Sequence, residues 1–478
     1  MTALQMVHRP LQYRLDFASP NAAVYHERTV AIGSLPISLE RHYHVRGERI
    51  EWAFGAFLPA LQADLVDLAL SVYVADRVSP RQHHDRNDPY HMQWRRHFHL
   101  RVPVREPAFW NQPALYKDLR ALLEQFTDDA WAFEFVHRPI DDDMPRQGFL
   151  FPMRPVDPVV VPFSGGLDSL AGAVDLVASR PGDTLVSFSA GTNPRTISRQ
   201  RLLTRALANR FGQRIEPVEV PFGLRAQGHD YPDGEATQRS RGFVFLALAA
   251  VVAEQAGANN VAVCENGIGA LSLPYNRTQL GTHTTRAVHP LSLIRMSRFV
   301  GTVFGRPFRI HNPYLFHTKG EMCIRLAAHG WAALAPTSVS CDTFAAHRDS
   351  HGPQCGLCTS CLLRRQSLHA AGLADIDARD GYRYDVIDPG ERPTDKQLYP
   401  LHAMRDQVEQ LRACLRGSMP WLQLTALFPI LEEVRHAVAV FEGLDSATIE
   451  KDLVRLYRTY VDEWTTFPAI APLRERAS

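Results

Sequence analysis

Apolar residues recur at helical and strand spacing through the first part of the chain. Residues 59–72 carry leucine or valine at steps of three or four, which predicts a helix with one buried face. Residues 98–104 and 131–135 alternate apolar with other positions as half-buried strands do, and residues 115–126 between them predict a second amphipathic helix. The pattern predicts an N-terminal α+β module over residues 1–150 and indicates no role for it.

The hydrophobic pattern changes after Pro158. Four short apolar runs then alternate with helical stretches, at 159–162, 185–189, 215–220 and 261–263. Such alternation is typical of a parallel sheet with helices on both faces, so we expect a doubly wound α/β domain over 158–368. Acidic residues and prolines between Asp141 and Pro158 favour a linker before this domain.

The apolar pattern of the last part of the chain, residues 395–478, predicts a C-terminal helical segment. We expect its helices around 404–415, 422–441 and 449–464. The glycines at 417 and 443 mark the expected breaks between these helices. With the two preceding regions, the pattern predicts three structural units in a chain of 478 residues.

Charge and composition narrow the functional classes. The 52 basic and 51 acidic residues nearly cancel, so no overall field favours nucleic acid or a membrane surface, and nucleic acid is not indicated as a partner. No run approaches the ~18 apolar residues of a membrane span, and residues 1–20 lack the apolar stretch of a secretory signal. We therefore expect a cytoplasmic protein without a membrane partner.

A Ser-Gly-Gly-Leu-Asp-Ser run joins the strand at 159–161 to the helix at 170–177. Two glycines let the backbone turn tightly beside a phosphate, and the first amides of the helix point at the anion. The residues expected to bind ATP are Phe163, Ser164, Gly165, Gly166, Leu167, Asp168 and Ser169. Asp168 is expected to hold Mg²⁺, and the run lacks the Gly-Lys-Ser/Thr of a Walker loop. The alternative is an ordinary turn between a strand and a helix.

Four of the seven cysteines lie within 21 residues of each other: Cys341, Cys355, Cys358 and Cys361. Thiolates this close repel unless a cation binds them, and four sulfurs complete a structural Zn²⁺ shell. An iron–sulfur cluster uses similar ligands, and ordinary buried thiols are a further alternative. His347 or His351 could replace one cysteine.

The loop resembles that of the ATP-pyrophosphatase family, which breaks ATP between its α and β phosphates. With the later Ser-Cys and Cys-Gly-x-Cys-x-Ser-Cys-Leu-x-Arg runs, the sequence over about 157–368 is similar to the QueC family, the 7-cyano-7-deazaguanine synthases. The resemblance implies an adenine nucleotide alpha hydrolase-like fold and an AMP-forming ligase. It also implies adenylation of 7-carboxy-7-deazaguanine, amide formation with ammonia, and dehydration to the nitrile with a second ATP.

Further candidates surround the expected sheet edge. Lys319 follows Thr318 at a predicted helix start and is expected to assist catalysis with Asp168 and Ser169; a solvated lysine is the alternative. The expected substrate-binding residues are Arg239, Arg241, Glu265 and Tyr275. The two arginines could instead be an exposed pair. The asparagine that the family pairs with an arginine here and its Tyr-Pro-Asp-Cys run are both missing from this sequence.

The long flanks of the domain resemble the enlarged QueC-like proteins of bacterial anti-phage gene clusters, notably the QatC type. That resemblance suggests an amine on a partner protein of a defence gene cluster as acceptor, with ammonia as the alternative. An RNA-thiolating ATP-pyrophosphatase and a silent scaffold in a defence complex remain as competing classes. Thiolation would need a working cysteine outside the cluster, and only Cys264, Cys323 and Cys414 remain.

Overall fold

The structure is a computed structural model of all 478 residues. It describes residues 11–17, 23–25, 35–36, 43–45, 48–81, 95–138, 154–191, 193–224, 235, 237, 239–275, 286–342, 353–377, 381–388 and 393–469. Most of the predicted linker, and both His347 and His351, lie outside these residues. Within them, no helix has the length and apolar character needed to cross a lipid bilayer.

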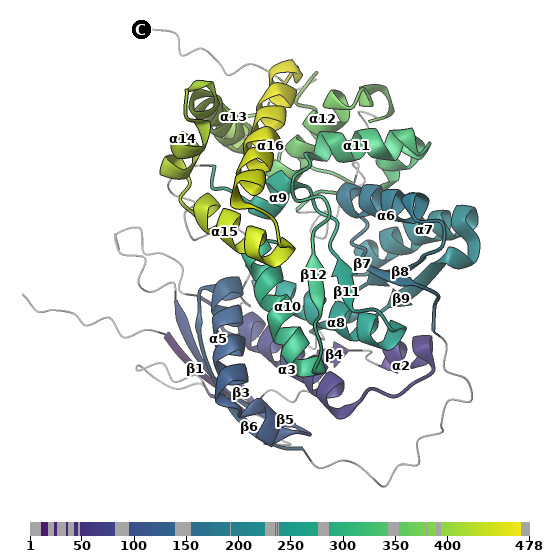
Figure 1. The fold of residues 1–478 in the computed structure, drawn as a ribbon, viewed down its shortest axis with the longest axis vertical. Coiled ribbons are helices and arrows are strands. Elements are labelled where there is room, and N and C mark those ends of the chain that lie inside the picture. The colour runs from purple at the N-terminus through teal and green to yellow at the C-terminus, as the bar shows by residue number, and fades with distance from the viewer. Residues whose placement is uncertain are drawn as a thin grey trace, which may run out of the picture.

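A five-stranded parallel sheet forms the centre of the molecule (Figure 1). Its strands are β7 (Pro158–Pro162), β8 (Thr184–Ser189), β9 (Ile215–Glu219), β11 (Asn260–Ala262) and β12 (Arg309–His311). The spatial order β12-β11-β7-β8-β9 places the reversal of strand order between β7 and β11. Ligands of open α/β sheets bind at the carboxyl ends of the strands at such a reversal. The sequence predicts four of these strands and misses β12, in which Arg309 and His311 flank a single apolar residue, so that no apolar run marks the strand.

Helices cover both faces of this sheet. One face carries α6 (Leu167–Ser179), α7 (Pro194–Phe211) and α11 (Lys319–Ala328), and the other carries α8 (Arg241–Ala256) and α10 (Pro290–Phe304). Side chains of β7 alternate between the two layers: Val159 and Val161 join the core under α6, and Val160 joins the core under α8. The predicted doubly wound α/β class is confirmed.

A second, mixed sheet is built by the N-terminal part of the chain, in the order β3-β2-β1-β5-β6. Its strands are β1 (Leu11–Asp16), β2 (Ala23–Tyr25), β3 (Leu35–Pro36), β5 (Arg96–Val104) and β6 (Ala130–His137), and α3 (Ala60–Val78) and α5 (Pro113–Thr127) cover it. These two helices also pack on α8 and α10, so one apolar core extends from Trp131 to Val160. The domain boundary near residue 150 stays a prediction.

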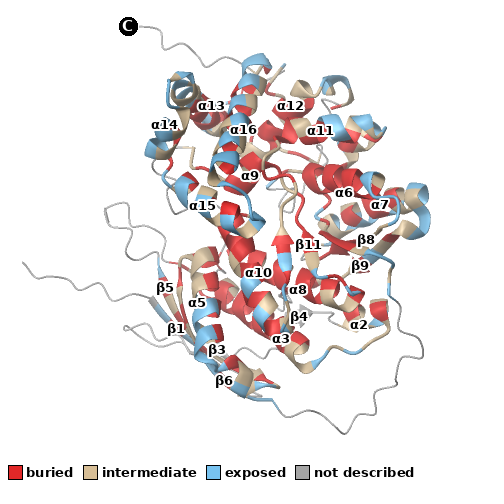
Figure 2. Cartoon of the chain, in the orientation of Figure 1, coloured by how far each residue is buried: buried red, intermediate tan, exposed pale blue. Residues whose placement is uncertain are grey.

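Shorter elements complete the N-terminal and central parts. They are β4 (Tyr43–Val45), α2 (Glu48–Phe54), α4 (Pro107–Trp110), β10 (Phe222–Leu224), α9 (Gly267–Leu271), α12 (Thr359–Ala370) and the 3₁₀ helices at 212–214, 332–337 and 374–376. Strands β4 and β10 pair antiparallel and so link the two parts of the chain. Figure 2 shows that the helices between the two sheets, α8 and α10 among them, are largely buried.

Between residues 394 and 469 the structure describes four helices: α13 (Asp395–Arg416), α14 (Pro420–Leu427), α15 (Ile430–Glu442) and α16 (Ser446–Thr466). They share a hydrophobic core with α9 and α12. The single helix expected at 422–441 is wrong: Pro429 lacks an amide donor and disfavours helical backbone at Phe428, which splits it into α14 and α15. Helix α13 also begins before Pro400, because Thr394 and Gln397 form a capping box.

Candidate nucleotide and substrate site

The Ser164–Ser169 loop lies at the carboxyl end of β7, where α6 begins. Gly165 has a φ of +80°, a conformation that favours glycine. The Ser164 hydroxyl accepts a hydrogen bond from the Gly166 amide (3.2 Å) and donates to Ser169 Oγ (3.1 Å). Gly166 caps α6 without a side chain, so the first amides of this helix remain available to an anion.

A buried charged cluster sits directly behind the loop. Asp168 Oδ2 lies 3.1 Å from the ammonium of Lys319, and it also accepts a hydrogen bond from the Asn266 side chain (3.1 Å). The same amide nitrogen donates to Glu265 Oε1 (2.8 Å). The structure thus brings together one cation and two carboxylates from three elements: the start of α6, the end of β11 and the start of α11.

Burial shapes the protonation of this cluster. Desolvation raises the pKa of Glu265 well above its ordinary value, and the neighbouring Asp168 raises it further, while Lys319 acts in the opposite direction. Burial would lower the pKa of Lys319, but Asp168 and Glu265 together raise it on balance, so the lysine stays protonated. The site therefore carries a fixed positive charge beside the loop.

The geometry fits a phosphate chain with Mg²⁺. Asp168 Oδ1 is buried and has no hydrogen-bond partner among the described residues, which leaves a carboxylate oxygen for a hard cation. A Cβ at Gly166 would meet Ser164 Oγ at 3.3 Å, so the loop surface is close-packed and favours the absence of a side chain. The first amides of α6 and Asp168 Oδ1 are therefore the candidate ligands for a phosphate and for a divalent cation.

A cavity of about 200 Å³ opens beside the loop. Its walls are mostly apolar, as an adenine ring requires, and they are formed by Phe163, Phe188, Ala190, Phe245, Leu246 and Val263. Arg241 also lines this cavity, with its guanidinium stacked 4.9 Å from the Phe245 ring and a buried Nε that has no partner among the described residues. A buried guanidinium in this position suits an anionic ligand.

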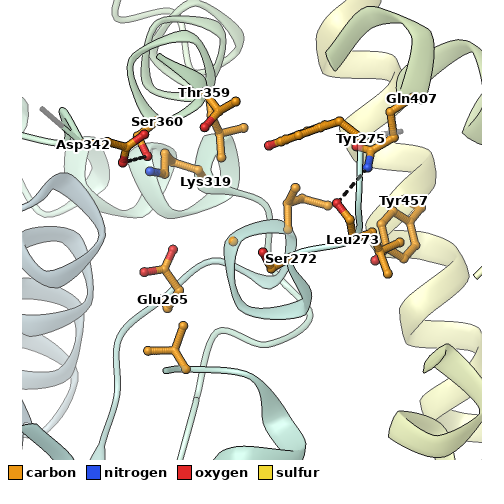
Figure 3. Close-up of a pocket in the computed structure, with 14 residues that line it drawn as sticks. Glu265, Ser272, Leu273, Tyr275, Lys319, Asp342, Thr359, Ser360, Gln407 and Tyr457 are labelled. Atoms are coloured by element: carbon orange, nitrogen blue, oxygen red, sulfur yellow. Dashed lines mark hydrogen bonds between the residues drawn. The ribbon is translucent and has the colours of Figure 1, made fainter. Parts of the chain in front are cut away.

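A second cavity of about 380 Å³ shares Glu265 and Val288 with the first. Figure 3 shows Glu265, Lys319, Asp342 and Ser360 on one side and Leu273, Tyr275, Gln407 and Tyr457 on the other. Ser360 Oγ donates to Asp342 (2.6 Å), and Gln407 Nε2 donates to the carbonyl oxygen of Leu273 (3.0 Å). Two of these wall residues, Gln407 and Tyr457, come from the C-terminal helices.

The structure separates the predicted substrate residues. Glu265 lines both cavities, whereas Tyr275 lines only the larger one and Arg241 only the smaller one. Arg239 points elsewhere: its guanidinium pairs with Asp128 of the N-terminal part (2.6 Å), and it is not among the described residues lining either cavity. All assigned roles remain predictions.

Sequence reasoning missed several residues of the two cavities. Asn266 bridges two acids, and only its place directly after Glu265 at a strand end could have singled it out. Gln200 on α7 donates to the Phe163 carbonyl (3.0 Å) and keeps a buried oxygen without a described partner at the smaller cavity. Gln407 and Tyr457 carry no local motif, since only the packing of distant helices brings them to the larger cavity.

The four clustered cysteines converge at the start of α12. Their Sγ atoms all lie within 4.8 Å of one another, and Cys355 and Cys361 are 3.9 Å apart. Tetrahedral Zn–S bonds of 2.3 Å place sulfurs about 3.8 Å apart, whereas an iron–sulfur cluster holds its thiolates farther apart. Backbone amides donate to several of the sulfurs, for example Cys358 N–H to Cys355 Sγ (3.2 Å). The cluster fits one zinc ion.

The sheet, the loop and the cysteine cluster together define an alpha hydrolase-like α/β domain with a zinc-type site. A family model described as "Queuosine biosynthesis protein QueC" matches residues 158–372. A 7-cyano-7-deazaguanine synthase of Anaeromyxobacter sp. (strain Fw109-5) is 32% identical over 240 residues, which cover 46% of this chain and 96% of that protein. The synthase of Methylococcus capsulatus (strain ATCC 33009 / NCIMB 11132 / Bath) is 33% identical over 232 residues, with the same coverage. The chain belongs to the QueC family.

Proposed function

We propose that this chain is an AMP-forming ligase that adenylates the carboxylate of a 7-deazaguanine and converts it to an amide. The main support is the pair of adjoining cavities that share Glu265, with the phosphate loop at one and Lys319 at the other. ATP in the smaller cavity would present its α-phosphate to a carboxylate in the larger one. The names of the relatives suggest the deazaguanine ring.

Each step balances with these residues. A carboxylate oxygen of the substrate attacks the α-phosphorus, and pyrophosphate leaves toward the amides of α6, Ser164 and Ser169. Lys319 stabilises the negative charge that develops on the phosphates. Mg²⁺, held through Asp168, would neutralise the phosphate oxygens. An amine nitrogen then attacks the acyl carbon, the carbon–oxygen bond to AMP breaks so that AMP leaves, and the proton lost by the amine passes to water.

The acceptor is the finer part of the proposal. We propose an amine on a partner protein of an anti-phage gene cluster, with free ammonia as the conservative alternative. The larger cavity is walled partly by Gln407 and Tyr457, which lie outside the region matched by the family model. Two wall residues outside the matched region, beside a phosphate loop within it, support an acceptor different from that of the relatives. Ammonia followed by dehydration would give the nitrile that the relatives are named for.

The cysteines outside the cluster argue against RNA thiolation. Burial raises the pKa of the Cys264 thiol far above its ordinary value, and it raises that of Cys323 to about 12. A thiol of this kind has almost no nucleophilic thiolate at neutral pH. Burial raises the pKa of the Cys414 thiol on α13 as well, and Cys414 does not line either cavity among the described residues.

The test is to incubate the protein with ATP, Mg²⁺ and 7-carboxy-7-deazaguanine, with ammonia or the candidate partner, and to follow AMP and product masses. Asp168→Ala is expected to lower AMP formation by about 100-fold or more. Asp183→Ala is the matched control, because this aspartate of the same domain lies in a partly exposed pair with Arg180 (3.7 Å). Partner mass increased by one deazaguanine acyl group supports the protein acceptor; free nitrile supports ammonia. No AMP in any mixture refutes the activity.

The defence role has a separate test in cells. Phage plating on bacteria that carry the whole gene cluster is expected to be reduced, and Asp168→Ala is expected to restore it if adenylation is required. Unchanged protection by Asp168→Ala would contradict an enzymatic role in defence and favour the scaffold.

A further inference from the structure

The helix that begins at Lys319 is held in place by the C-terminal segment. Thr318 caps this helix: its side chain accepts from the Glu321 amide (3.1 Å), and Glu321 reciprocates in a capping box. The Thr318 hydroxyl proton is donated to Glu463 Oε1 on α16. Since Thr318 is fully buried, water cannot replace Glu463 as the acceptor of this bond without rearrangement.

Helix α16 contacts both sides of Lys319. A Cβ at Gly320 would overlap Glu463 Oε1, so the carboxyl group lies directly against the backbone after the lysine. The second oxygen of Glu463 accepts from Gln366 on α12, the helix that carries Cys361 (3.2 Å). Glu463 therefore ties together α16, the lysine helix and the helix of the cysteine cluster.

A second residue of α16 strengthens this attachment. Arg455 pairs with Glu321 (2.6 Å) and also donates to the backbone carbonyl of Phe316. The turn from Phe316 to Glu321 is thus held on both sides by one helix, and this turn is what places Lys319 next to Asp168. A lysine side chain is flexible, so the position of its ammonium depends on the backbone from which it starts.

We propose that Glu463 is a positioning residue for Lys319, so that the C-terminal segment forms part of the nucleotide site. The inference rests on the proposed function in one respect, that Lys319 contacts the phosphates of ATP. Glu463 itself is bonded to Thr318 and Gln366 and does not line either cavity among the described residues. Its effect on the reaction is therefore transmitted through the start of α11.

The test is a double-mutant cycle on the full chain, with two measurements: the Kd of Mg·ATP by calorimetry and the kcat and KM for AMP formation. Glu463→Ala is expected to lower kcat by about 10- to 100-fold, because a displacement of about 1 Å costs that much. Glu463→Gln is expected to lose much less than Glu463→Ala, since its amide oxygen still accepts from Thr318, although its amide nitrogen cannot accept from Gln366. Adding Glu463→Ala to Lys319→Ala is expected to cause no further loss.

Glu442→Ala is the matched control. Glu442 is another carboxylate of the C-terminal segment, and its partly exposed pair with Arg309 (2.7 Å) is remote from the lysine helix. It is expected to leave both measurements unchanged. Zinc content and circular dichroism identify a variant that has simply unfolded, and Glu463→Gln then provides the comparison.

Additive losses in the double variant, or wild-type values for Glu463→Ala, would overturn the inference. A loss in Glu463→Gln equal to that in Glu463→Ala would also overturn it, because the hydrogen bond would not be what matters. If the wild type binds Mg·ATP but forms no AMP, the proposed function is refuted while the present inference is not. The double-mutant cycle measured on the Kd of Mg·ATP then decides whether Glu463 acts through Lys319.

Discussion

Replacing Glu463 by glutamine is expected to make the stability of the protein less sensitive to a rise in pH from about 5 to about 8. Burial raises the pKa of this carboxyl group to about 7 from an ordinary value of 4.5; hydrogen bonds from Thr318 and Gln366 oppose the shift, and Glu321 and Asp462 add to it. A raised carboxyl pKa means that the folded state prefers the neutral form. Its stability contribution is thus fully present below pH 4.5 and is lost as the pH rises through 7.

The difference between the two pKa values corresponds to a loss of about 3 kcal/mol well above pH 7, of which about 2 kcal/mol falls between pH 5.5 and 8.5. Glutamine cannot ionise, so the variant escapes this loss. The unfolding free energy of Glu463→Gln minus that of the wild type should therefore increase by about 2 kcal/mol across this range.

Urea unfolding at several pH values, followed by tryptophan fluorescence and by circular dichroism, measures this difference. Agreement between the two probes checks that one cooperative transition is observed. Glu442→Gln serves as control, since neutralising a partly exposed pair is expected to cost less than about 1 kcal/mol at every pH. A Glu463→Gln difference that does not change with pH would show that Glu463 is ionised without penalty, and the reasoning from burial would be wrong.

Three further predictions concern the loop, the metal and the N-terminal part. Gly166→Val is expected to abolish AMP formation with the fold intact, whereas Gly182→Ala, which meets no atom within 4 Å, should not change it. Metal analysis should find about one zinc per chain, and Cys361→Ser should lose it together with stability against heat. Asp128→Asn removes the charge that pairs with Arg239 and Arg286, and asparagine tolerates the φ of +60° at this position. This variant should weaken ATP binding, measured by calorimetry, by up to about tenfold, whereas the control Glu134→Gln should leave it unchanged.

Local patterns in the sequence account for much of the fold and for the residues of the loop and the cysteine cluster. The sequence shows the alternation of buried and half-buried residues in β5 and the two glycines before α6, because each pattern involves residues that are close together along the chain. The link between Glu463 and Thr318 spans 145 positions and has no periodic signal. Arg239 shows the opposite case. Its position at a predicted helix start favours substrate binding, whereas in the structure its guanidinium is paired with Asp128.

The two flanks of the matched region both reach the site, and they reach different parts of it. Asp128 of the N-terminal part pairs with Arg239 (2.6 Å) and Arg286 (2.7 Å), which lie two positions before Arg241 and Val288 in the wall of the smaller cavity. The C-terminal helices contribute to the wall of the larger cavity and hold the start of α11. The two relatives described above are each matched over 96% of their own length, by 240 and 232 residues. They therefore have little room for flanks of this size. Because the phosphate loop lies within the shared region, whereas Gln407 and Tyr457 of the larger cavity lie outside it, we expect this chain to differ from them in the acceptor more than in adenylation.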